Sequence, residues 1–165
     1  MEVNDIIKQA YYAGGCFWGM EYMMKRQKGV VEVTTGFMGG ELENPTYEQV
    51  YQDNTGHVET ICVDYDPRII SYESLTKLFF EMHDPTQVDG QGPDLGTRYR
   101  SAIFYNDMEE RVCAEKLIGI LQQKGYVVAT ELRQASTFYA AEEYHQHYYQ
   151  KRGTTPYCHA YTKRF

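Results

Sequence analysis

The segment at residues 14–19, Gly-Gly-Cys-Phe-Trp-Gly, constrains this chain more than any other. It follows a short apolar run at residues 10–13 and precedes a stretch with helical character. We therefore predict a strand over residues 9–14, a tight turn at the glycines, and a helix over residues 16–28. Glycine allows both the sharp turn and the close approach of another group. Cys16 then lies where the helix begins.

A cysteine at a helix N-terminus is in a special electrostatic position. The unpaired backbone N–H groups and the helix dipole favour its thiolate form. Trp18, the chain's only tryptophan, follows two residues later and places an aromatic surface beside the thiol. The alternative is that Cys16 is a buried cysteine in an apolar helix start. The flanking glycines and aromatic residues favour a reactive thiol.

Composition limits the classes of function. A chain of 165 residues, of which 42% are hydrophobic, is sufficient for one domain with one core. The net charge of −7 argues against nucleic acid or an anionic membrane as the main partner. No stretch reaches the ~20 apolar residues of a membrane span, and the acidic N-terminus lacks the apolar region of a signal peptide. We therefore expect a cytoplasmic protein whose thiols stay reduced.

The order of the expected elements indicates a single α+β domain. Strands and helices alternate irregularly, and no internal repeat or linker divides the chain. Besides the first strand and helix, we predict strands at residues 30–35, 57–66, 101–105 and 126–132. We predict further helices at residues 71–82, between Asp107 and Gly125, and at residues 142–152, and long loops at residues 36–47 and 85–97.

The strand at residues 57–66 carries an acidic residue on its apolar face. Glu59 shares a face with Ile61 and Val63, the larger aliphatic residues, and this face is expected to point toward the core. A carboxyl group in a core is either paired with a base or held protonated by desolvation. The alternative is that Glu59 reaches water at the end of the strand.

The remaining cysteines are interpreted one by one, because positions 16, 62, 113 and 158 form no C-x-x-C pair and no zinc-finger spacing. Cys113 falls on the apolar stripe of its helix and is expected in the core. Cys158 lies in a polar, turn-rich tail, where a thiol is either incidental or resolves an oxidised partner. A thiolate, a proton donor and a second thiol together are the requirements of a redox reaction.

Two other chemistries are weaker. A cysteine hydrolase needs a histidine base, and nothing in the sequence forces any of the five histidines next to Cys16. A zinc site would use neighbouring histidines, but His145 and His147 are two residues apart and would point in different directions on a helix.

Several separate strings together resemble one family, the A type of peptide methionine sulfoxide reductase. They cover nearly the whole chain and occur in the order typical of that family. The first is specific by itself, and five in the right order leave little room for chance. The strings are residues 15–19 (GCFWG), 56–59 (GHVE), 83–87 (HDPTQ), 96–101 (GTRYRS) and 138–146 (FYAAEEYHQ).

The resemblance implies a fold and a reaction. The implied fold is a two-layer α/β sandwich with a central mixed sheet and a ferredoxin-like core, one domain over residues 1–165. Cys16 would attack the sulfoxide sulfur of methionine-S-sulfoxide, in proteins or free, and become a sulfenic acid. Glu59 would give a proton to the sulfoxide oxygen, which agrees with its position on the core face of its strand.

The resemblance also implies a binding pocket. Tyr47 and Tyr99 match the tyrosines that hold the sulfoxide oxygen in this family. Phe17 and Trp18 match the aromatic residues around the substrate's methyl group. Asp94 matches a loop aspartate that orders the site through a polar network.

The implied recycling step uses the tail at residues 154–165. Cys158 resembles the resolving cysteine of members that have one, so it would form a disulfide with Cys16 that thioredoxin reduces. No cofactor or metal is implied, and the partners are thioredoxin and oxidised proteins or peptides. We expect a monomer. A redox-sensing or oxidised-methionine-binding module without turnover is the alternative function.

Three features depart from the family's usual pattern. Arg98 stands in place of a usual Gln and could alter the charge near Tyr99. Phe37 replaces a frequent Tyr, which is a mild change. The tail continues for only seven residues after Cys158, so we expect a cycle with one disulfide.

Overall fold

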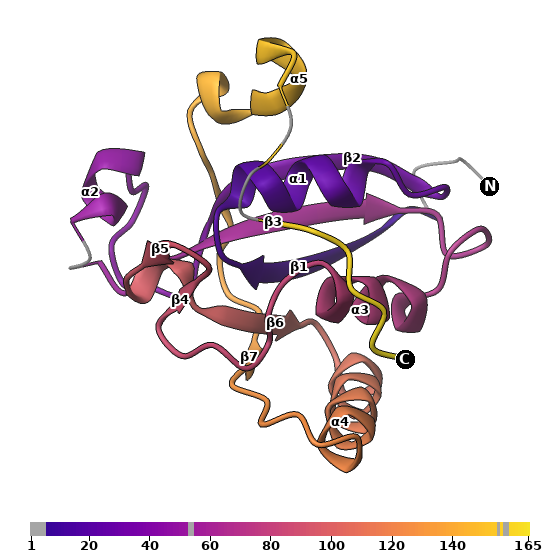
Figure 1. Cartoon of the computed structure of the whole chain (residues 1–165). Coiled ribbons are helices and arrows are strands. Elements are labelled where there is room, and N and C mark those ends of the chain that lie inside the picture. Colours follow the sequence, from indigo (N-terminus) through magenta and orange to yellow (C-terminus); the bar gives the residue numbers. More distant parts are fainter. Residues whose placement is uncertain (1–5, 53–54, 155, 157–158) are drawn as a thin grey trace.

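The computed structural model describes residues 6–52, 55–154, 156 and 159–165. Its centre is a six-stranded mixed sheet with the strand order β7-β6-β1-β3-β2-β8 (Figure 1). All neighbouring strands are antiparallel except β6 and β7, which are parallel. The strands are β1 (Lys8–Gly14), β2 (Val30–Met38), β3 (Val58–Tyr65), β6 (Ser101–Tyr105), β7 (Glu131–Gln134) and β8 (Tyr139–Ala140). A separate two-stranded hairpin joins β4 (Gly90–Gln91) to β5 (Asp94–Leu95).

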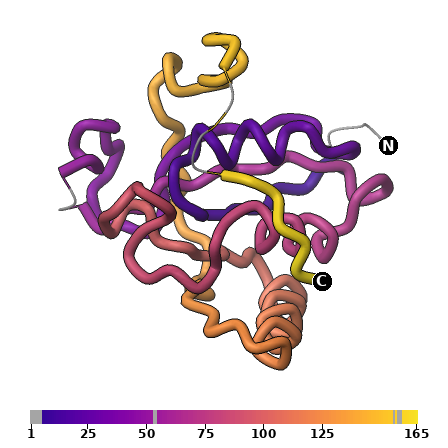
Figure 2. Tube along the Cα trace, in the orientation of Figure 1, coloured from indigo at the N-terminus to yellow at the C-terminus, as the bar shows by residue number. Residues whose placement is uncertain are grey.

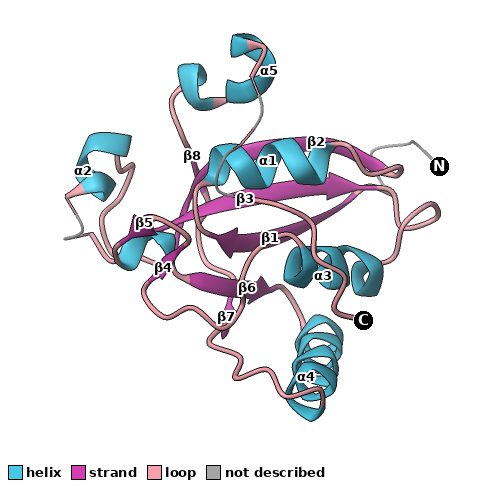
Figure 3. Cartoon of the chain, viewed as in Figure 1, coloured by secondary structure: helices cyan, strands magenta, loops and turns pink. Residues whose placement is uncertain are grey.

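Three helices cover one face of the sheet. They are α1 (Phe17–Lys25), α3 (Tyr72–Glu81) and α4 (Met108–Gln123), shown in cyan in Figure 3. Each of the last two begins where the sequence supplies a cap: Ser71 Oγ accepts a hydrogen bond from Ser74 N–H, and the Asp107 carboxylate accepts one from Glu110 N–H. The predicted positions of these helices are therefore confirmed. No helix within the described residues has the length and apolar character needed to cross a membrane.

The strands divide their side chains between two layers of core. In β1, Ala10 and Tyr12 pack with the helices, whereas Ala13 packs in a smaller cluster on the opposite face. In β3, Ile61 and Val63 lie on the helix-covered face and are fully buried. Because side chains alternate along a strand, Glu59 lies on that same face, as predicted.

The mixed sheet and its helix layer confirm the expected α+β architecture of two layers. The four central strands lie side by side in the order β6-β1-β3-β2. Along the chain, α1 connects β1 to β2, and α3 lies in the segment between β3 and β6. The finer description of a ferredoxin-like core stays a prediction.

The predicted loop at residues 36–47 begins later than expected. Strand β2 continues through Met38, because Phe37 and Met38 are fully buried and pair with Glu59 and Val58 of β3. Apolar burial therefore outweighs the helix- and strand-breaking tendency of the glycines in this region. The predicted strand at residues 126–132 is also shifted: β7 begins at Glu131, where it pairs with β6.

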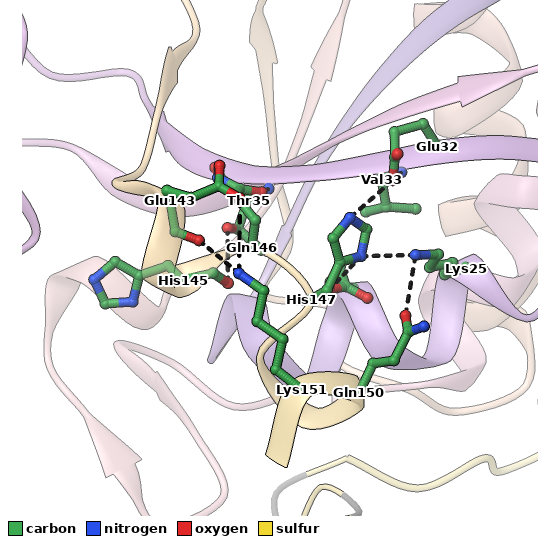
Figure 4. A network of polar contacts seen from close by, with 11 residues as sticks. Lys25, Glu32, Val33, Thr35, Glu143, His145, Gln146, His147, Gln150 and Lys151 are labelled. Atoms are coloured by element: carbon green, nitrogen blue, oxygen red, sulfur yellow. Dashed lines mark hydrogen bonds and ion pairs between the residues drawn. The ribbon is translucent and has the colours of Figure 1, made fainter. Parts of the chain in front are cut away.

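The predicted continuous helix at residues 142–152 is wrong. The chain forms a short 3-10 helix, η3 (Glu143–His145), and then α5 (Tyr148–Arg152). His147 separates them in a left-handed conformation with φ of 56°, which a continuing α-helix does not allow. Polar contacts of the His147 ring stabilise the break: its Nδ1 is 2.7 Å from Lys25 Nζ, and its Nε2 is 3.4 Å from a carboxylate oxygen of Glu32 (Figure 4). Tyr144 and Tyr148 consequently do not share one helix face.

The end of the chain is attached to the body of the fold. Figure 2 shows residues 159–165 running from the beginning of α1 toward α3. Thr162 N–H donates a 2.7 Å hydrogen bond to the carbonyl of Glu81 at the end of α3. The ring of Phe165 packs against Phe80, with the ring centroids 6.2 Å apart. These contacts position the tail across the edge of the helix layer.

Candidate active site

Cys16 lies between the end of β1 and the first turn of α1. It occupies the N-cap position, with φ of −54° and ψ of 118°, and its carbonyl accepts a hydrogen bond from Met20 N–H. The side chain is buried, with 6% of the residue exposed. At this position the thiol is next to the positive end of the helix dipole, which favours the thiolate.

The two glycines before Cys16 are required by geometry. Gly15 has φ of 94°, in the left-handed region that other residues avoid. A Cβ atom on Gly14 would lie 2.9 Å from the Met20 side chain and 3.1 Å from the His83 ring. The turn that was predicted from the glycines is therefore present, and its backbone is closely packed on both sides.

Glu59 is buried beside Cys16. It projects from β3 and is 2% exposed, and its Oε1 accepts a 3.1 Å hydrogen bond from Phe17 N–H at the start of α1. Its Oε2 has no hydrogen-bond partner among the described residues. Burial raises the pKa of Glu59 well above its usual value, and the nearby Cys16 raises it further, whereas the Phe17 N–H bond opposes the shift. The raised pKa favours the protonated form of this carboxyl group.

Aromatic rings form a wall next to this acid. The Phe17 ring lies 5.5 Å from that of Phe37 and 6.2 Å from those of Trp18 and Tyr47, between centroids. The indole of Trp18 stacks on the ring of Tyr148, with the centroids 3.8 Å apart and the planes 7° from parallel. An apolar surface of this kind suits a small apolar group better than a charged one.

Two tyrosines come to the site from separate elements. Tyr47 is the first residue of α2 (Tyr47–Tyr51), which Thr46 and Gln49 open with a capping box. Tyr99 ends the 3-10 helix η2 (Thr97–Tyr99). Burial raises the pKa of both tyrosines, and the proximity of Glu59 is the next cause for each. Both hydroxyls therefore remain protonated and can donate hydrogen bonds.

Arg98 connects these two elements. Its guanidinium lies 4.4 Å from the ring centroids of both Tyr51 and Tyr99, and it donates a 3.0 Å hydrogen bond to the carbonyl of Tyr51. Its positive charge lowers the pKa of Glu59, while the charge of Asp94 on β5 raises it. The residue that departs from the family's usual pattern is thus part of the site's surroundings.

The structure brings most of the predicted site residues together. Cys16, Phe17, Trp18, Tyr47, Glu59, Asp94 and Tyr99 are linked by the contacts and charge effects above. Cys158 lies outside the described residues. His159, the next residue, is buried, and its Nε2–H donates a 2.7 Å hydrogen bond to the carbonyl of Gly14. A histidine is therefore packed against the turn that carries Cys16, which the sequence did not require.

Sequence reasoning assigned no role to two further residues of the site. Trp18 Nε1–H donates a 3.1 Å hydrogen bond to Nδ1 of His145, and Tyr47 N–H donates a 3.1 Å bond to Glu142. Both acceptors belong to the string at residues 138–146, which is one of the strings that resemble the family. Their function was hidden because the segment is not a regular helix.

The other described cysteines are not reactive thiols. Burial raises the pKa of Cys62 to about 12, with Asp64 as the next cause. Burial also raises the pKa of Cys113, which packs against the core. Both shifts disfavour the thiolate that redox chemistry needs.

His83 also lies near the turn that carries Cys16, but its ring is engaged inside the core. Burial lowers the pKa of His83 to about 3, and its ring bridges the carbonyl of Phe79 and the hydroxyl of Ser101 inside the core. Among the residues that the structure describes, no three His, Cys, Asp or Glu side chains are grouped as metal ligands would be.

Known proteins resemble this chain over nearly its full length. Residues 8–165 match the family described as peptide methionine sulfoxide reductase. The peptide methionine sulfoxide reductase MsrA of Sulfolobus acidocaldarius is 47% identical over 150 residues, which cover 90% of this chain and 85% of that protein.

Solved structures agree with this similarity. Mxr1 from Saccharomyces cerevisiae in reduced form superposes with a TM-score of 0.89 and 32% identity, covering 100% of this chain and 96% of that one. Mxr1 in complex with Trx2 superposes with a TM-score of 0.65 and 26% identity, covering 98% and 94% of the two chains.

Replacing Glu59 by Gln should stabilise the protein in a pH-dependent way. Folding raises the pKa of this carboxyl group above its unfolded value, near 4.5. Below pH 4.5 the group is protonated in both states, and its contribution to the free energy of unfolding is fully present. As the pH rises toward the folded pKa, the unfolded state loses the proton and this contribution is lost. Gln is neutral and can still accept the Phe17 N–H bond. The free energy of unfolding of Glu59→Gln should therefore exceed that of wild type by an amount that grows by at most about 1.4 kcal/mol per pH unit.

Urea unfolding between about pH 4 and about pH 8 measures this difference. The exposed Glu43, changed to Gln, controls for the loss of one negative charge. If the difference in the free energy of unfolding between Glu59→Gln and wild type were the same at all pH values, the conclusion that Glu59 has a raised pKa would be wrong.

Proposed function

The chain belongs to the peptide methionine sulfoxide reductase family, and from this premise we propose how its own residues reduce methionine-S-sulfoxide with thiols. The enzyme is a peptide-methionine (S)-S-oxide reductase. One observation carries the assignment of residues: the buried Glu59 carboxyl, with an unpartnered Oε2, lies beside the only described cysteine at a helix N-terminus. Their proximity supports the assignment of Cys16 as the nucleophile and Glu59 as the proton donor.

In the first step the Cys16 thiolate attacks the sulfoxide sulfur while Glu59 gives its proton to the sulfoxide oxygen. The oxygen is then transferred as hydroxyl, which leaves methionine and a sulfenic acid on Cys16. The substrate sulfur gains two electrons and the Cys16 sulfur loses two. The raised pKa of Glu59 supports this role, because an ordinary carboxyl group would have no proton to give at neutral pH.

Binding is assigned to the tyrosines and the aromatic wall. Tyr47 and Tyr99 would donate hydrogen bonds to the sulfoxide oxygen, since both keep their hydroxyl protons and both lie close enough to Glu59 to interact with it electrostatically. Phe17 and Trp18 would enclose the methyl group. Asp94 would order the polar side of the pocket, near enough to Glu59 for its charge to act there.

In the second step the Cys158 thiol would attack the sulfenic acid, releasing water and forming a Cys16–Cys158 disulfide. The position of His159 on the carbonyl of Gly14 supports this, because it places the residue after Cys158 at the turn that carries Cys16. Thioredoxin would then reduce the disulfide, in line with the relative solved in complex with Trx2. The thiols supply the electrons, so the scheme needs no further cofactor. The proposal includes a monomer that acts in the cytoplasm.

A stereospecific assay tests the first step. Wild type should reduce methionine-S-sulfoxide, and not the R epimer, with dithiothreitol or thioredoxin. Cys16→Ser should be inactive, and Glu59→Gln should lower kcat by roughly 10²- to 10⁴-fold with little change in substrate binding. Wild type that binds the sulfoxide in calorimetry but does not reduce it would instead indicate a sensing or binding module.

Gly19 offers a test of the recycling step. A Cβ atom at this position would overlap the His159 imidazole, although alanine itself favours a helix. Gly19→Ala should therefore leave the first turnover unchanged and slow thioredoxin-dependent turnover by roughly 10- to 100-fold, as misplaced reacting groups do.

The variant His159→Gly removes the imidazole that docks the tail on the Gly14 carbonyl and should also slow thioredoxin-dependent turnover while the first turnover is unchanged. Cys158→Ser is the matched control, with one turnover and no thioredoxin-dependent cycle. If Gly19→Ala cycles as fast as wild type with thioredoxin, the docking of the tail at Cys16 is not part of recycling.

A further inference from the structure

The indole of Trp18 has a hydrogen-bond partner that the reaction scheme does not use. Its Nε1–H donates to Nδ1 of His145 over 3.1 Å, and the two rings lie within 20° of parallel. A neutral imidazole can accept at Nδ1 only when its proton is on Nε2. That nitrogen is 3.5 Å from Oε2 of Glu142, which is close enough for electrostatic attraction, but it makes no hydrogen bond within the described residues.

His145 is fixed by contacts that do not involve Trp18. The residue is 1% exposed, and its carbonyl accepts a 3.3 Å hydrogen bond from the hydroxyl of Thr35 on β2. The next residue, Gln146, pairs its side-chain amide with both the N–H and the carbonyl of Thr35, at 2.9 Å each. Figure 4 shows this attachment, with the imidazole of His145 directed away from that of His147. His145 is therefore an anchored acceptor to which the half-buried indole is tied.

The segment that carries His145 also contacts Tyr47. Glu142 Oε1 accepts a 3.1 Å hydrogen bond from Tyr47 N–H, and the Tyr47 and His145 rings are 4.4 Å apart between centroids. Trp18 and Tyr47 are far apart in the sequence, and both contact this one segment. Their relative placement thus depends on His145 and Glu142.

Burial preserves the acceptor. It lowers the pKa of His145, with the carboxylate of Glu142 opposing the shift, so that the ring stays neutral at neutral pH. A protonated ring would have no lone pair on Nδ1 for the indole N–H. On the other side of this contact, Tyr148 stacks on the indole at 3.8 Å and limits its tilt.

We propose that His145 is a positioning residue that sets the plane of the Trp18 indole, and with it the size of the pocket for the substrate's S-methyl group. The inference rests on the proposed role of Trp18 in enclosing the methyl group. His145 acts through Trp18 and touches neither the sulfoxide nor the proton that is transferred. Its loss therefore affects substrate affinity and size selectivity more than the chemical step.

Two variants distinguish the effect of the hydrogen-bond acceptor Nδ1 from that of the aromatic ring of His145. His145→Phe keeps an aromatic ring against Phe17 and Tyr47 but has no acceptor, whereas the Oδ1 of His145→Asn can take the place of Nδ1. In His145→Phe we expect KM for methionine-S-sulfoxide to rise about three- to tenfold, which is the effect expected from the loss of one neutral hydrogen bond. The value of kcat should stay within about twofold of wild type. The preference for the S-methyl over the S-ethyl sulfoxide should fall as well. His145→Asn should restore most of both.

The indole N–H itself gives an assay that is independent of activity. The chain has one tryptophan, so its indole proton produces one NMR signal. This signal should move upfield in folded His145→Phe and stay near its wild-type position in His145→Asn. An inactive wild type would overturn the proposed function, while the NMR result would still test the His145–Trp18 bond.

A double-mutant cycle with Trp18→Phe, which has no indole N–H, tests the route of action. If His145 acts through Trp18, His145→Phe should have no further effect on KM or on size selectivity in the Trp18→Phe background. An equal effect in both backgrounds would overturn the proposal, as would a wild-type KM, selectivity and indole signal in His145→Phe. Should His145→Phe not fold, a wild-type indole signal and KM in His145→Leu would overturn it equally.

Discussion

The hydrogen bond from Phe17 N–H to Glu59 is the interaction on which the rest of the site depends. It joins the beginning of α1 to the middle of the sheet and fixes the carboxyl group next to Cys16. The Cys16 thiol and the Glu59 carboxyl group then share one buried space, so that a negative charge on one disfavours a negative charge on the other. A thiolate on Cys16 thus implies a proton on Glu59, which is the division of charge that sulfoxide reduction requires.

Substrate recognition is built from segments that the fold brings to this pair. The aromatic wall comes from α1 and β2, the tyrosines come from α2 and η2, and the anchor of Trp18 comes from the segment before α5. The segments that carry the tyrosines and His145 are short, and they are fixed by polar contacts such as those of Gln146 with Thr35 and of Arg98 with Tyr51. The sheet and these attachments together hold the aromatic and polar residues beside Cys16 and Glu59.

Much of the fold and the site could be predicted, because the relevant signals are local. The glycines around Cys16 and the alternation in β3 placed the thiol and Glu59 correctly. The break at His147 could not be predicted, since it depends on tertiary contacts with Glu32 and Lys25 that no local pattern contains. The roles inferred for His145 and Glu142 likewise depend on tertiary contacts, with Trp18 and Tyr47.

The most direct measurement of the central claim is the protonation state of Glu59 in the reduced enzyme. Infrared difference spectra between wild type and Glu59→Gln at neutral pH would isolate this one carboxyl group. We predict the C=O stretch of a protonated carboxylic acid in wild type, absent from the variant. A difference spectrum that contains only carboxylate bands would contradict the account, because Glu59 would then have no proton to give.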